Sequence, residues 1–407
     1  MSKTVWVVYQ YASTPETGIG GRHYYLGREL AKMGYKVYLI SANSHHLLRN
    51  KPELIKKYEI EVIDKGFKFV WVKMPDYTEA HSKQRVMNWF LFPWRIQKLA
   101  GAIPDKPDAI LSSSPSVVAF LGARHLARKF KAKLIFEVRD IWPLTLTEIG
   151  GYSPRHPFIR FMQWVEDKAY RDSDAVVSNL KNSIEHMVGR GMQACKFSWI
   201  PNGISIDEVS LKSPLSADIK SKLPSGKFTV GYTGTHGVAN ALNVLVDAAE
   251  RLRDYPDIVF VLVGGGKEKA TLRRRVKERG LSNLIFIDPI PKAQIQSMLS
   301  EFDACYIGWL NDDLYRFGIG ANKIPDYLYS GKPIIHSYSG ACDPVMEAQA
   351  GIQIPAEDPE QLAEAVIRLY EMSEEERWSM GENGRKAALE LYEYEKLAEQ
   401  LATILFK

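Results

Sequence analysis

Short apolar runs alternate with amphipathic stretches along the first half of the chain. Residues 4–9 predict a buried strand, the glycine-rich segment 18–21 follows, and residues 23–32 have the apolar spacing of a helix. Residues 36–40 predict the next strand. Strand, glycine turn, helix and strand form the βαβ pattern of a parallel sheet. Further buried strands are expected at residues 61–63, 69–72, 109–111, 133–137 and 175–177.

The same pattern begins again after the Pro- and Ser-rich segment 201–224. A strand (228–232), a glycine loop (234–237) and a helix (241–253) are expected there. Strands at 258–263, 284–287, 304–307 and 333–337 and a helix near 323–330 complete the set. Two alternating sets predict two doubly wound, Rossmann-like α/β domains with a ligand cleft between them. We expect the domains at residues 1–205 and 206–385, with a C-terminal helix at 386–407 packing back on the first.

Composition and charge narrow the class of protein. Of 407 residues, 45% are hydrophobic and 25% charged, as in soluble globular proteins, and a net charge of +5 is too small to indicate a nucleic-acid partner. Three separated cysteines without a CxxC motif fit a reducing compartment. No signal peptide is recognisable, and no apolar segment reaches the roughly 18 residues that span a bilayer. We expect a cytoplasmic protein, either free or on the inner face of the cytoplasmic membrane.

Two glycine loops follow the first strands of the two domains. In open α/β sheets, ligands bind outside the carboxyl ends of the strands, and a helix that follows a glycine loop offers backbone N–H groups to a phosphate. Residues 18–21 and 234–237 stand at such ends, although neither loop has the GxGxxG or P-loop pattern. Each loop taken alone is equally typical of a tight strand-to-helix turn. The presence of one such loop in each of the two domains favours the binding of an anionic ligand.

A third segment adds side chains to this prediction. Lys323 and Asp326 are three residues apart and share one face of the helix expected near 323–330. The lysine suits a phosphate, and the aspartate can accept hydrogen bonds from ribose hydroxyls. The alternative interpretation is an ordinary salt bridge on a surface helix.

These segments resemble the retaining glycosyltransferases of family 4, which have the GT-B fold, over nearly the full chain. Within that family, the chain is most similar to bacterial transferases of N-acetyl-L-fucosamine in surface-polysaccharide synthesis. The resemblance is carried by IGGRHYYLGRELAKMGYKV (19–37), EVRDIWP (137–143), PNGI (201–204), GYTGTHG (231–237) and NKIPDYLYSGKPII (322–335). It implies transfer of an N-acetylated hexosamine from a UDP-sugar to a polyprenyl-diphosphate-linked saccharide, in O-antigen or capsule synthesis. It also implies that neither a metal nor a cofactor is needed.

The chain departs from the family at the donor site. Many members carry two glutamates seven residues apart where this chain has Gly318 and Asp326, and the usual Arg and Lys after the first strand of the second domain are missing. We expect Lys323, glycine-loop N–H groups, and Arg22 or Arg139 to bind the diphosphate. His23 and His236 would assist when protonated. The predicted donor-binding residues are Gly20, Gly21, Arg22, Gly234, Thr235, His236, Gly264, Gly265, Ile290, Gly318, Ile319, Gly320, Asn322, Lys323 and Asp326.

Three charged residues stand at the end of the strand expected at 133–137. Glu137, Arg139 and Asp140 stand where ligands bind, so we predict that they act in catalysis, with Asp140 nearest the reacting centre. The alternative is an internal ion-pair network. In retaining enzymes of this fold the leaving phosphate is thought to take the acceptor proton, so no carboxylate nucleophile is required.

The segment from His81 to Ala100 lacks acidic residues and mixes basic with aromatic ones. This composition favours a patch that lies on an anionic membrane or contacts the acceptor. The predicted contacts are Arg85, Trp89, Phe90, Phe92, Trp94 and Arg95. A core helix with basic edges is the alternative.

Two other functions remain open from the sequence. A nonhydrolysing UDP-sugar epimerase shares the two-domain fold, but it would need a denser cluster of carboxylates and histidine. A non-catalytic partner subunit of a glycosyltransferase would explain Gly318 and the missing Arg and Lys, but not the retention of Lys323 and Asp326.

Overall fold

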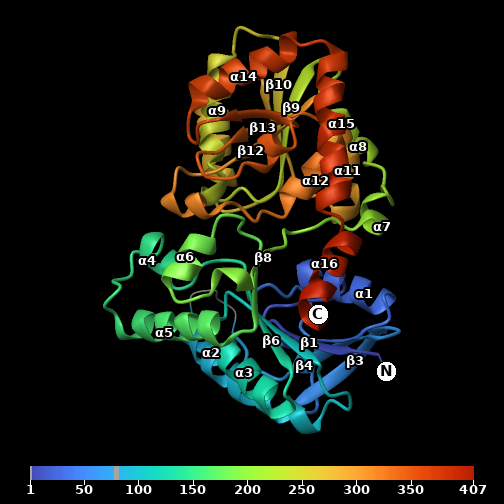
Figure 1. The fold of residues 1–407 in the computed structure, drawn as a ribbon. Coiled ribbons are helices and arrows are strands. Elements are labelled where there is room, and N and C mark those ends of the chain that lie inside the picture. The colour runs from blue at the N-terminus through green and yellow to red at the C-terminus, as the bar shows by residue number, and fades with distance from the viewer. Residues whose placement is uncertain (1, 78–81) are drawn as a thin grey trace. The chain divides into compact units, whose positions relative to one another are not determined.

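The computed structural model describes residues 2–77 and 82–407, so His81 of the expected membrane patch lies outside the described residues. The chain forms two compact units (Figure 1). Unit 1 comprises Met1–Asn202 and Tyr394–Lys407, and unit 2 comprises Gly203–Glu393. The division therefore falls at 202/203 and 393/394, whereas the sequence-based boundaries were placed at 205/206 and 385/386.

Unit 1 is built on an eight-stranded sheet with the order β3-β4-β2-β1-β5-β6-β7-β8. The strands are β1 Thr4–Val8, β2 Lys36–Ala42, β3 Tyr58–Asp64, β4 Phe67–Val72, β5 Ala109–Ser113, β6 Lys133–Val138, β7 Ala175–Ser178 and β8 Phe197–Trp199. All neighbouring strands pair in parallel except β3 and β4. The expectation of a buried strand at 61–63 was wrong, because β3 is an antiparallel edge strand whose side chains are half-buried or exposed. The edge strand β8 was not predicted.

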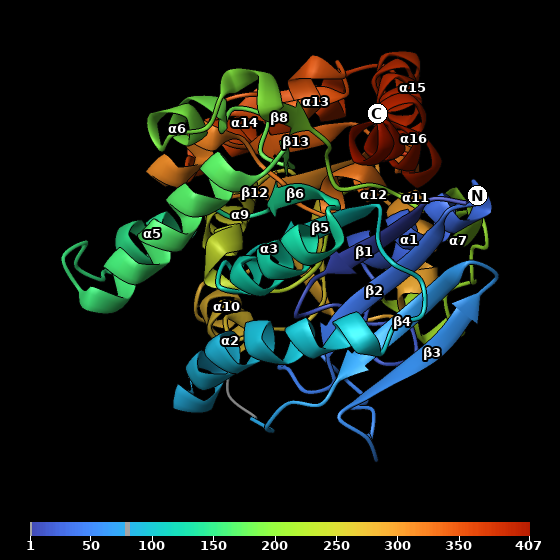
Figure 2. The same ribbon diagram turned by 60° about the horizontal axis from the view of Figure 1, so that its bottom comes forward.

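Helices cover both faces of this sheet. They are α1 Arg22–Lys32, α2 Lys83–Ile96, α3 Ala119–Phe130, α4 Leu144–Glu148, α5 Pro157–Asp172, α6 Ile184–Gly189 and α16 Tyr394–Phe406, with short 3₁₀ helices η1 Gln97–Gly101 and η2 Ala194–Lys196. Figure 1 shows α1 beside α16, and Figure 2 shows α2 beside α3; both pairs are in contact. Two stacked aromatic pairs join α16 to the α1 region: Tyr25 with Tyr394, and Tyr35 with Phe406.

Unit 2 contains a parallel six-stranded sheet with the order β11-β10-β9-β12-β13-β14. The strands are β9 Phe228–Thr233, β10 Ile258–Val263, β11 Leu284–Ile287, β12 Ala304–Gly308, β13 Ile334–Ser337 and β14 Gly351–Ile354. The helices are α7 Ile206–Val209, α8 Ala217–Lys222, η3 Val238–Asn240, α9 Leu242–Arg251, α10 Lys269–Glu278, η4 Lys292–Gln294, α11 Ile295–Ser300, η5 Asp313–Phe317, α12 Lys323–Ser330, α13 Pro344–Glu347, α14 Pro359–Glu371 and α15 Glu374–Leu391. Helix α9 packs on α14, and α12 packs on α11 and α15.

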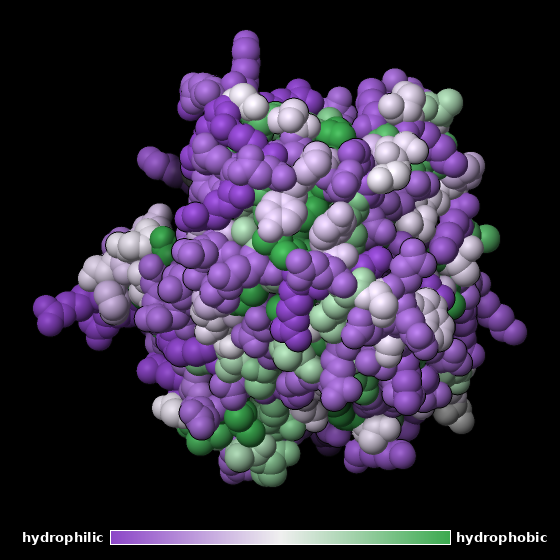
Figure 3. All heavy atoms as spheres, turned by 90° about the horizontal axis from the view of Figure 1, so that it is seen from above, coloured by the Kyte–Doolittle hydropathy of each residue, from purple (hydrophilic) through white to green (hydrophobic). Residues whose placement is uncertain are grey.

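The central strands are buried and mostly apolar because helices cover both faces of each sheet. Every residue of β1 (TVWVV) and of β10 (IVFVLV) is buried. Burying one such Val, Leu or Ile side chain contributes about 1.5–3 kcal/mol. On the face in Figure 3, hydrophilic residues cover most of the surface, and apolar residues lie in small groups among them.

Candidate functional site

Two glycine turns pack against each other at the carboxyl ends of β9 and β10. The backbone is in the positive-φ region at Gly264 (φ 144°) and Gly266 (φ 151°). A Cβ atom on Gly264 would overlap the carbonyl oxygen of Gly234, and one on Gly266 would overlap that of His236. The turns are joined by hydrogen bonds from Gly234 N to Val263 O (3.0 Å) and from His236 N to Gly265 O (2.8 Å). Gly264 and Gly265 therefore shape the 234–237 loop, and the N–H groups of Gly234 and His236 are already engaged.

Lys323 begins α12 and points its amine toward the 234–237 loop. Its Nζ donates hydrogen bonds to the hydroxyl of Tyr232 (2.9 Å) and to Oδ1 of Asn240 (2.7 Å). The amine also lies 4.4 Å from the ring centroid of Tyr232 and 5.5 Å from that of Trp309. Burial lowers the pKa of Lys323 to about 7. None of the carboxylates in the described residues forms an ion pair with it.

Asp326 occupies the same helix but a different environment. No hydrogen bond or ion pair joins it to Lys323 in the described part of the chain, so the salt-bridge interpretation of this pair was wrong. Burial raises the pKa of Asp326 to about 6, Lys292 lowers it, and Glu208 raises it further. Asn322 is exposed and precedes α12 without capping it through its side chain. Ile290 is half-buried against the apolar core of unit 2.

His236 is fully buried in the 234–237 loop. Burial, together with Lys269, Arg273 and Lys323, lowers the pKa of its imidazole to about 4. Within the described residues, neither ring nitrogen has a hydrogen-bond partner. The expected protonated, phosphate-binding form therefore does not fit this environment near neutral pH, where the ring is neutral and offers one N–H donor.

The 318–320 loop stands between η5 and α12. Gly318 has φ 92°, which favours glycine, and its N–H is engaged with Tyr315 O at 3.0 Å. The backbone N–H groups of Thr235 and Ile319 donate to no acceptor among the described residues. Like the N–H of Gly237, for which the described residues also supply no acceptor, they are available to an anion.

Three residues that the sequence analysis did not single out complete this environment. Tyr232 ends β9 beside Lys323, Trp309 directly follows β12, and His336 lies in β13. The indole of Trp309 donates to Nε2 of His336 (2.9 Å), and Nδ1 of His336 lies 2.9 Å from Oδ1 of Asp343. Aromatic residues at the carboxyl ends of predicted strands were the available signal for Tyr232 and Trp309.

In unit 1, Glu137 is the centre of a buried polar network. Its side chain is 1% exposed, and its oxygens accept hydrogen bonds from Arg22 Nε (2.8 Å) and Ser113 Oγ (2.6 Å) and lie 2.5 Å from His23 Nε2. Despite the opposing effect of burial, His23 and Arg22 hold the pKa of Glu137 well below its usual range. This internal network was the alternative interpretation of Glu137, and it leaves no carboxylate oxygen for a substrate.

Arg22 is also committed inside unit 1. Its guanidinium is 0% exposed, pairs with Glu137 and donates to the carbonyl of Pro201. The expectation that Arg22 binds the donor diphosphate does not fit this burial. Gly20 and Gly21 have φ values of 67° and 88°, and they deliver the chain into α1 so that Arg22 and His23 face inward.

Arg139 and Asp140 differ from Glu137, because both reach solvent in unit 1. Arg139 is half-buried, donates from Nη1 to the hydroxyl of Tyr9 (2.9 Å) and stands over the Tyr9 ring. Asp140 is exposed. The hydroxyl of Ser114 accepts hydrogen bonds from the backbone N–H groups of Arg139 (2.8 Å) and Asp140 (3.4 Å), which holds the turn after β6.

The predicted membrane residues of α2 lie on two faces. Trp89 (6% exposed) and Phe92 (0%) point into the core, so a membrane contact does not fit them. Phe90 (46%) and Trp94 (54%) are exposed, and Arg95 is half-buried. Arg85 stands over the ring of Trp89.

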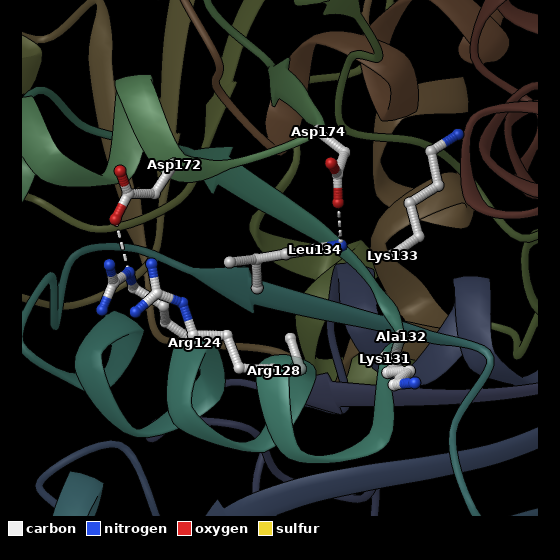
Figure 4. A pocket seen from close by; sticks show the side chains of 9 residues that line it. Arg124, Arg128, Lys131, Ala132, Lys133, Leu134, Asp172 and Asp174 are labelled. Atoms are coloured by element: carbon white, nitrogen blue, oxygen red, sulfur yellow. Dashed lines mark hydrogen bonds and ion pairs between the residues drawn. The ribbon is translucent and has the colours of Figure 1, made fainter.

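A basic cavity of about 550 Å³ lies at the amino end of β6 (Figure 4). Arg124 pairs with Asp172, Lys133 donates to Ile404 O (2.7 Å), and Asp174 accepts from Leu134 N (2.7 Å). Cations at the C-terminal end of α3 complement its dipole. This cavity is at the edge of the sheet opposite to the carboxyl ends of the strands.

The described residues contain neither a cluster of metal-binding side chains nor a helix that could span a membrane. Across residues 2–77 and 82–407, no three or more His, Cys, Asp and Glu side chains are placed to hold a metal ion. Over the same residues, no helix combines the length and apolar character needed to span a membrane.

Two family models match the chain. The model described as Glycosyltransferase Family 4 matches residues 17–208, and the model described as Glycosyl transferases group 1 matches residues 227–372. Together they cover most of both units.

Two curated proteins of Escherichia coli are similar in sequence. A putative colanic acid biosynthesis glycosyl transferase, WcaI of strain K12, is 24% identical over 315 residues, which are 74% of this chain and 75% of that protein. The O-antigen chain mannosyltransferase C is 24% identical over 236 residues, or 58% of this chain and 61% of that protein.

Solved structures agree in fold. The sucrose-phosphate synthase of Thermosynechococcus elongatus matches with a TM-score of 0.72 at 17% identity, covering 99% of this chain and 98% of that one. HepE of Anabaena, solved with UDP and glucose, matches with a TM-score of 0.65 at 16% identity, covering 98% of each chain. WaaG, a glycosyltransferase involved in lipopolysaccharide biosynthesis, matches with a TM-score of 0.66 at 15% identity, covering 99% of each chain. The expected GT-B fold, with two Rossmann-like domains, is confirmed.

Proposed function

Since the chain is a glycosyltransferase that contains a Family 4 domain and a group 1 domain, we propose that it transfers a sugar from a UDP-sugar to a lipid-linked saccharide. The reaction would serve bacterial surface-polysaccharide assembly, O-antigen or capsule. The two E. coli relatives support this setting, because their names refer to colanic acid and to O-antigen chains. An N-acetylated hexosamine such as N-acetyl-L-fucosamine is the sugar that we propose, with retention of anomeric configuration and no metal requirement.

The environment of Lys323 carries the proposal. Burying an ammonium group costs free energy unless an anion accompanies it. Among the described residues, all hydrogen-bond partners of the Lys323 amine are neutral. A donor diphosphate would supply the missing negative charge, with the amine acting as a point charge and hydrogen-bond donor. Diphosphate binding would then raise the pKa of Lys323 from about 7.

The groups around Lys323 suit the remainder of a UDP-sugar. The N–H groups of Thr235 and Ile319, which have no acceptor among the described residues, can donate to diphosphate oxygens. Asp326, whose carboxylate accepts no hydrogen bond from the residues that the structure describes, is the acceptor that we propose for the ribose hydroxyls. UDP is the proposed nucleotide because the HepE structures with UDP and with UDP-glucose share this fold.

In unit 1, we propose that Asp140 and Arg139 contact the acceptor or the transferred sugar. Both are accessible at the carboxyl end of β6, and Ser114 holds their backbone. Glu137 would act as a positioning residue that keeps Arg22 and His23 in place. Sugar transfer develops positive charge at the anomeric carbon and negative charge on the leaving diphosphate, so oriented charges near these atoms lower the barrier.

A lipid-linked acceptor implies work at a membrane surface. The segment 82–100 contains no acid, and it exposes Phe90 and Trp94 beside Arg95 and Lys98. Aromatic and basic side chains together favour the interface of an anionic bilayer.

The nucleotide site is tested by calorimetric titration with UDP, GDP and ADP. We expect UDP to bind best, and Lys323→Ala to weaken UDP binding by roughly ten- to a hundredfold because it removes a charge-assisted contact. Lys222→Ala, an exposed lysine of the same unit, is the control and should bind as wild type. Equal UDP affinity in Lys323→Ala would remove this lysine from the site.

The reaction is tested by incubating the protein with a panel of UDP-sugars and a synthetic polyprenyl-diphosphate saccharide. Mass spectrometry of the lipid product would show which hexosamine is added, and NMR would show whether the anomeric configuration is retained. UDP binding without any lipid product from the whole panel would favour the non-catalytic partner. A changed UDP-sugar in the absence of acceptor would favour the epimerase.

A further inference from the structure

A groove in unit 1 shares no residue with the proposed diphosphate site or with Arg139 and Asp140, and it includes Trp94 and Arg95 of the predicted membrane or acceptor contacts. It has a volume of about 470 Å³ and is formed by the end of β4, the start of β3 and the C-terminal turn of α2. Its lining residues are Lys57, Tyr58, Val72, Lys73, Met74, Pro75, Trp94, Arg95 and Lys98. The apolar side chains form its floor, and four cations surround them.

All of the charged residues that line this groove are cations. None of its nine lining residues is acidic, and none of its four cations forms an ion pair with a carboxylate in the described residues. Burial lowers the pKa of Arg95, whose Nη1 donates to the carbonyl of Lys73. Lys73 Nζ donates to Leu54 O (2.8 Å), and Lys98 Nζ lies 3.8 Å from the ring centroid of Trp94. All of these partners are neutral, so an anion at the groove would complement the charge.

The groove continues into an exposed apolar stripe of α2. Met87, Phe90 and Trp94 are spaced by three and four residues, so they share one face of the helix, and they are 58%, 46% and 54% exposed. The opposite face of α2 carries the buried Trp89 and Phe92. An apolar face with cations at its end matches a helix lying in the headgroup region of a bilayer.

We propose that this groove binds one anionic phospholipid of the membrane. Arg95, Lys73 and Lys57 would hold the phosphate, and the glycerol and first methylenes would lie on Val72, Met74 and Trp94. The stripe of Met87, Phe90 and Trp94 would enter the interface beside the bound lipid. This inference deepens the membrane partner of the proposed function and names the residues that make the contact.

The test is co-sedimentation with vesicles of phosphatidylcholine, alone or mixed with phosphatidylglycerol. We expect binding only to the mixed vesicles and a fall of roughly fivefold for each groove cation removed. Lys57→Gln/Lys98→Gln alters two exposed side chains and should reduce binding about twenty-fold. The matched control is Arg128→Gln/Lys131→Gln. It removes two exposed cations of the basic cavity at the amino end of β6 and should bind vesicles as wild type does.

The apolar part is tested by Trp94→Ser, with Trp378→Ser as control because Trp378 is 65% exposed and lies in unit 2. Binding should fall for Trp94→Ser alone. The proposal is overturned if Lys57→Gln/Lys98→Gln and Arg128→Gln/Lys131→Gln lose vesicle binding equally. It is also overturned if the wild-type protein binds both kinds of vesicle equally. Displacement from vesicles by millimolar inorganic phosphate at constant ionic strength would also overturn it, because it would indicate a site for an aqueous anion.

Titration with UDP separates this inference from the proposed function. Groove variants should keep the wild-type affinity for UDP, which also shows that they are folded. A wild-type protein that binds UDP but no vesicle contradicts only the lipid site. One that binds vesicles but no nucleotide contradicts only the proposed function.

Discussion

The indole Nε1 of Trp309 donates a hydrogen bond of 2.9 Å to Nε2 of the buried His336. Since Nε2 accepts this bond, Nδ1 carries the proton and donates to Asp343. Asp343 is held in turn by the backbone N–H of Val345 (2.8 Å). This series of contacts runs from Asp343 through His336 and Trp309 to Lys323, whose amine lies over the Trp309 ring. His336 thus orients the aromatic wall of the proposed diphosphate site without touching the ligand.

Replacing His336 by Phe should weaken both stability and UDP binding. The change leaves the indole N–H of Trp309 buried without an acceptor, which costs about 1–3 kcal/mol of unfolding free energy. Thermal unfolding and calorimetric titration measure the two effects. The double variant His336→Phe/Trp309→Phe is the comparison, because it keeps a ring near Lys323 and removes the indole N–H that His336→Phe leaves unpaired. A stability loss with unchanged UDP affinity would show that His336 has a structural role only.

UDP affinity should fall as pH rises above about 7. The amine of Lys323, with its pKa lowered to about 7 by burial, is charged below that pH and neutral above it. Binding above pH 7 must therefore take up a proton, which costs up to about tenfold in affinity per pH unit. Titrations between pH 7 and 9 measure the slope. Lys323→Arg, which stays charged, should show no such fall; a wild-type affinity independent of pH would contradict the lowered pKa.

Lys323→Met should raise the melting temperature of the free protein while weakening UDP binding as Lys323→Ala does. The folded-state pKa of Lys323 lies below the ordinary lysine value of 10.5, so the unfolded chain binds more protons between about pH 7 and 10.5. The lysine is therefore destabilising at low pH, and its effect disappears as pH rises through this window. Scanning calorimetry at pH 6 and pH 9 should show a gain for Lys323→Met that is larger at pH 6. A lower melting temperature at both values would contradict this.

Glu137→Gln should destabilise unit 1 strongly. The substitution leaves the guanidinium of Arg22 buried without its counter-charge, and breaking a buried ion pair in this way costs about 3–5 kcal/mol. Denaturant unfolding measures the loss. Asp257→Asn removes the exposed pair with Lys227 and should change stability by less than about 1 kcal/mol. Similar losses of unfolding free energy in Glu137→Gln and Asp257→Asn would contradict a buried ion-pair network centred on Glu137.

Gly264→Ala should displace the 234–237 loop and reduce UDP binding. Its Cβ would overlap the carbonyl oxygen of Gly234, and its φ of 144° is one that side chains rarely adopt. Gly237→Ala is matched to it, because a Cβ there makes only ordinary contacts at 3.7 Å and φ is −114°. UDP titration of the two variants should separate them, and a normal affinity in Gly264→Ala would mean that the close approach of the two turns is not needed.

Asp140→Asn should abolish sugar transfer and leave UDP binding unchanged. Asp140 is an exposed residue of unit 1, and UDP is proposed to bind to unit 2. Product formation measured at saturating UDP-sugar tests the role of the carboxylate. Full activity of the variant would remove Asp140 from the reaction.

The sequence by itself determined the strands, the glycine turns and the order of the two α/β sets. Short apolar runs bounded by turns are typical of strands in parallel sheets covered on both faces, and this explains why β1, β10 and most of the central strands were predicted. The short edge strands β8 (FSW) and β14 (GIQI) were missed and β3 (YEIEVID) was taken as buried, because polar residues or glycine interrupt these three strands, whereas the edge strand β11 (LIFI) is apolar throughout and was predicted.

Only the tertiary structure decided which charged side chains pair with each other inside a unit and which remain available to a ligand. Arg22 and Glu137 are 115 residues apart, and no local pattern indicates that they neutralise each other inside unit 1. The spacing of Lys323 and Asp326 placed them on one helical face, but only the fold turns the amine toward Tyr232 and Asn240 and away from any described acid. In α2, apolar residues lie on every side of the helix, so only packing could bury Trp89 and Phe92 and leave Phe90 and Trp94 at the surface. Burial and charge pairing depend on contacts between distant segments, and these contacts exist only in the folded chain.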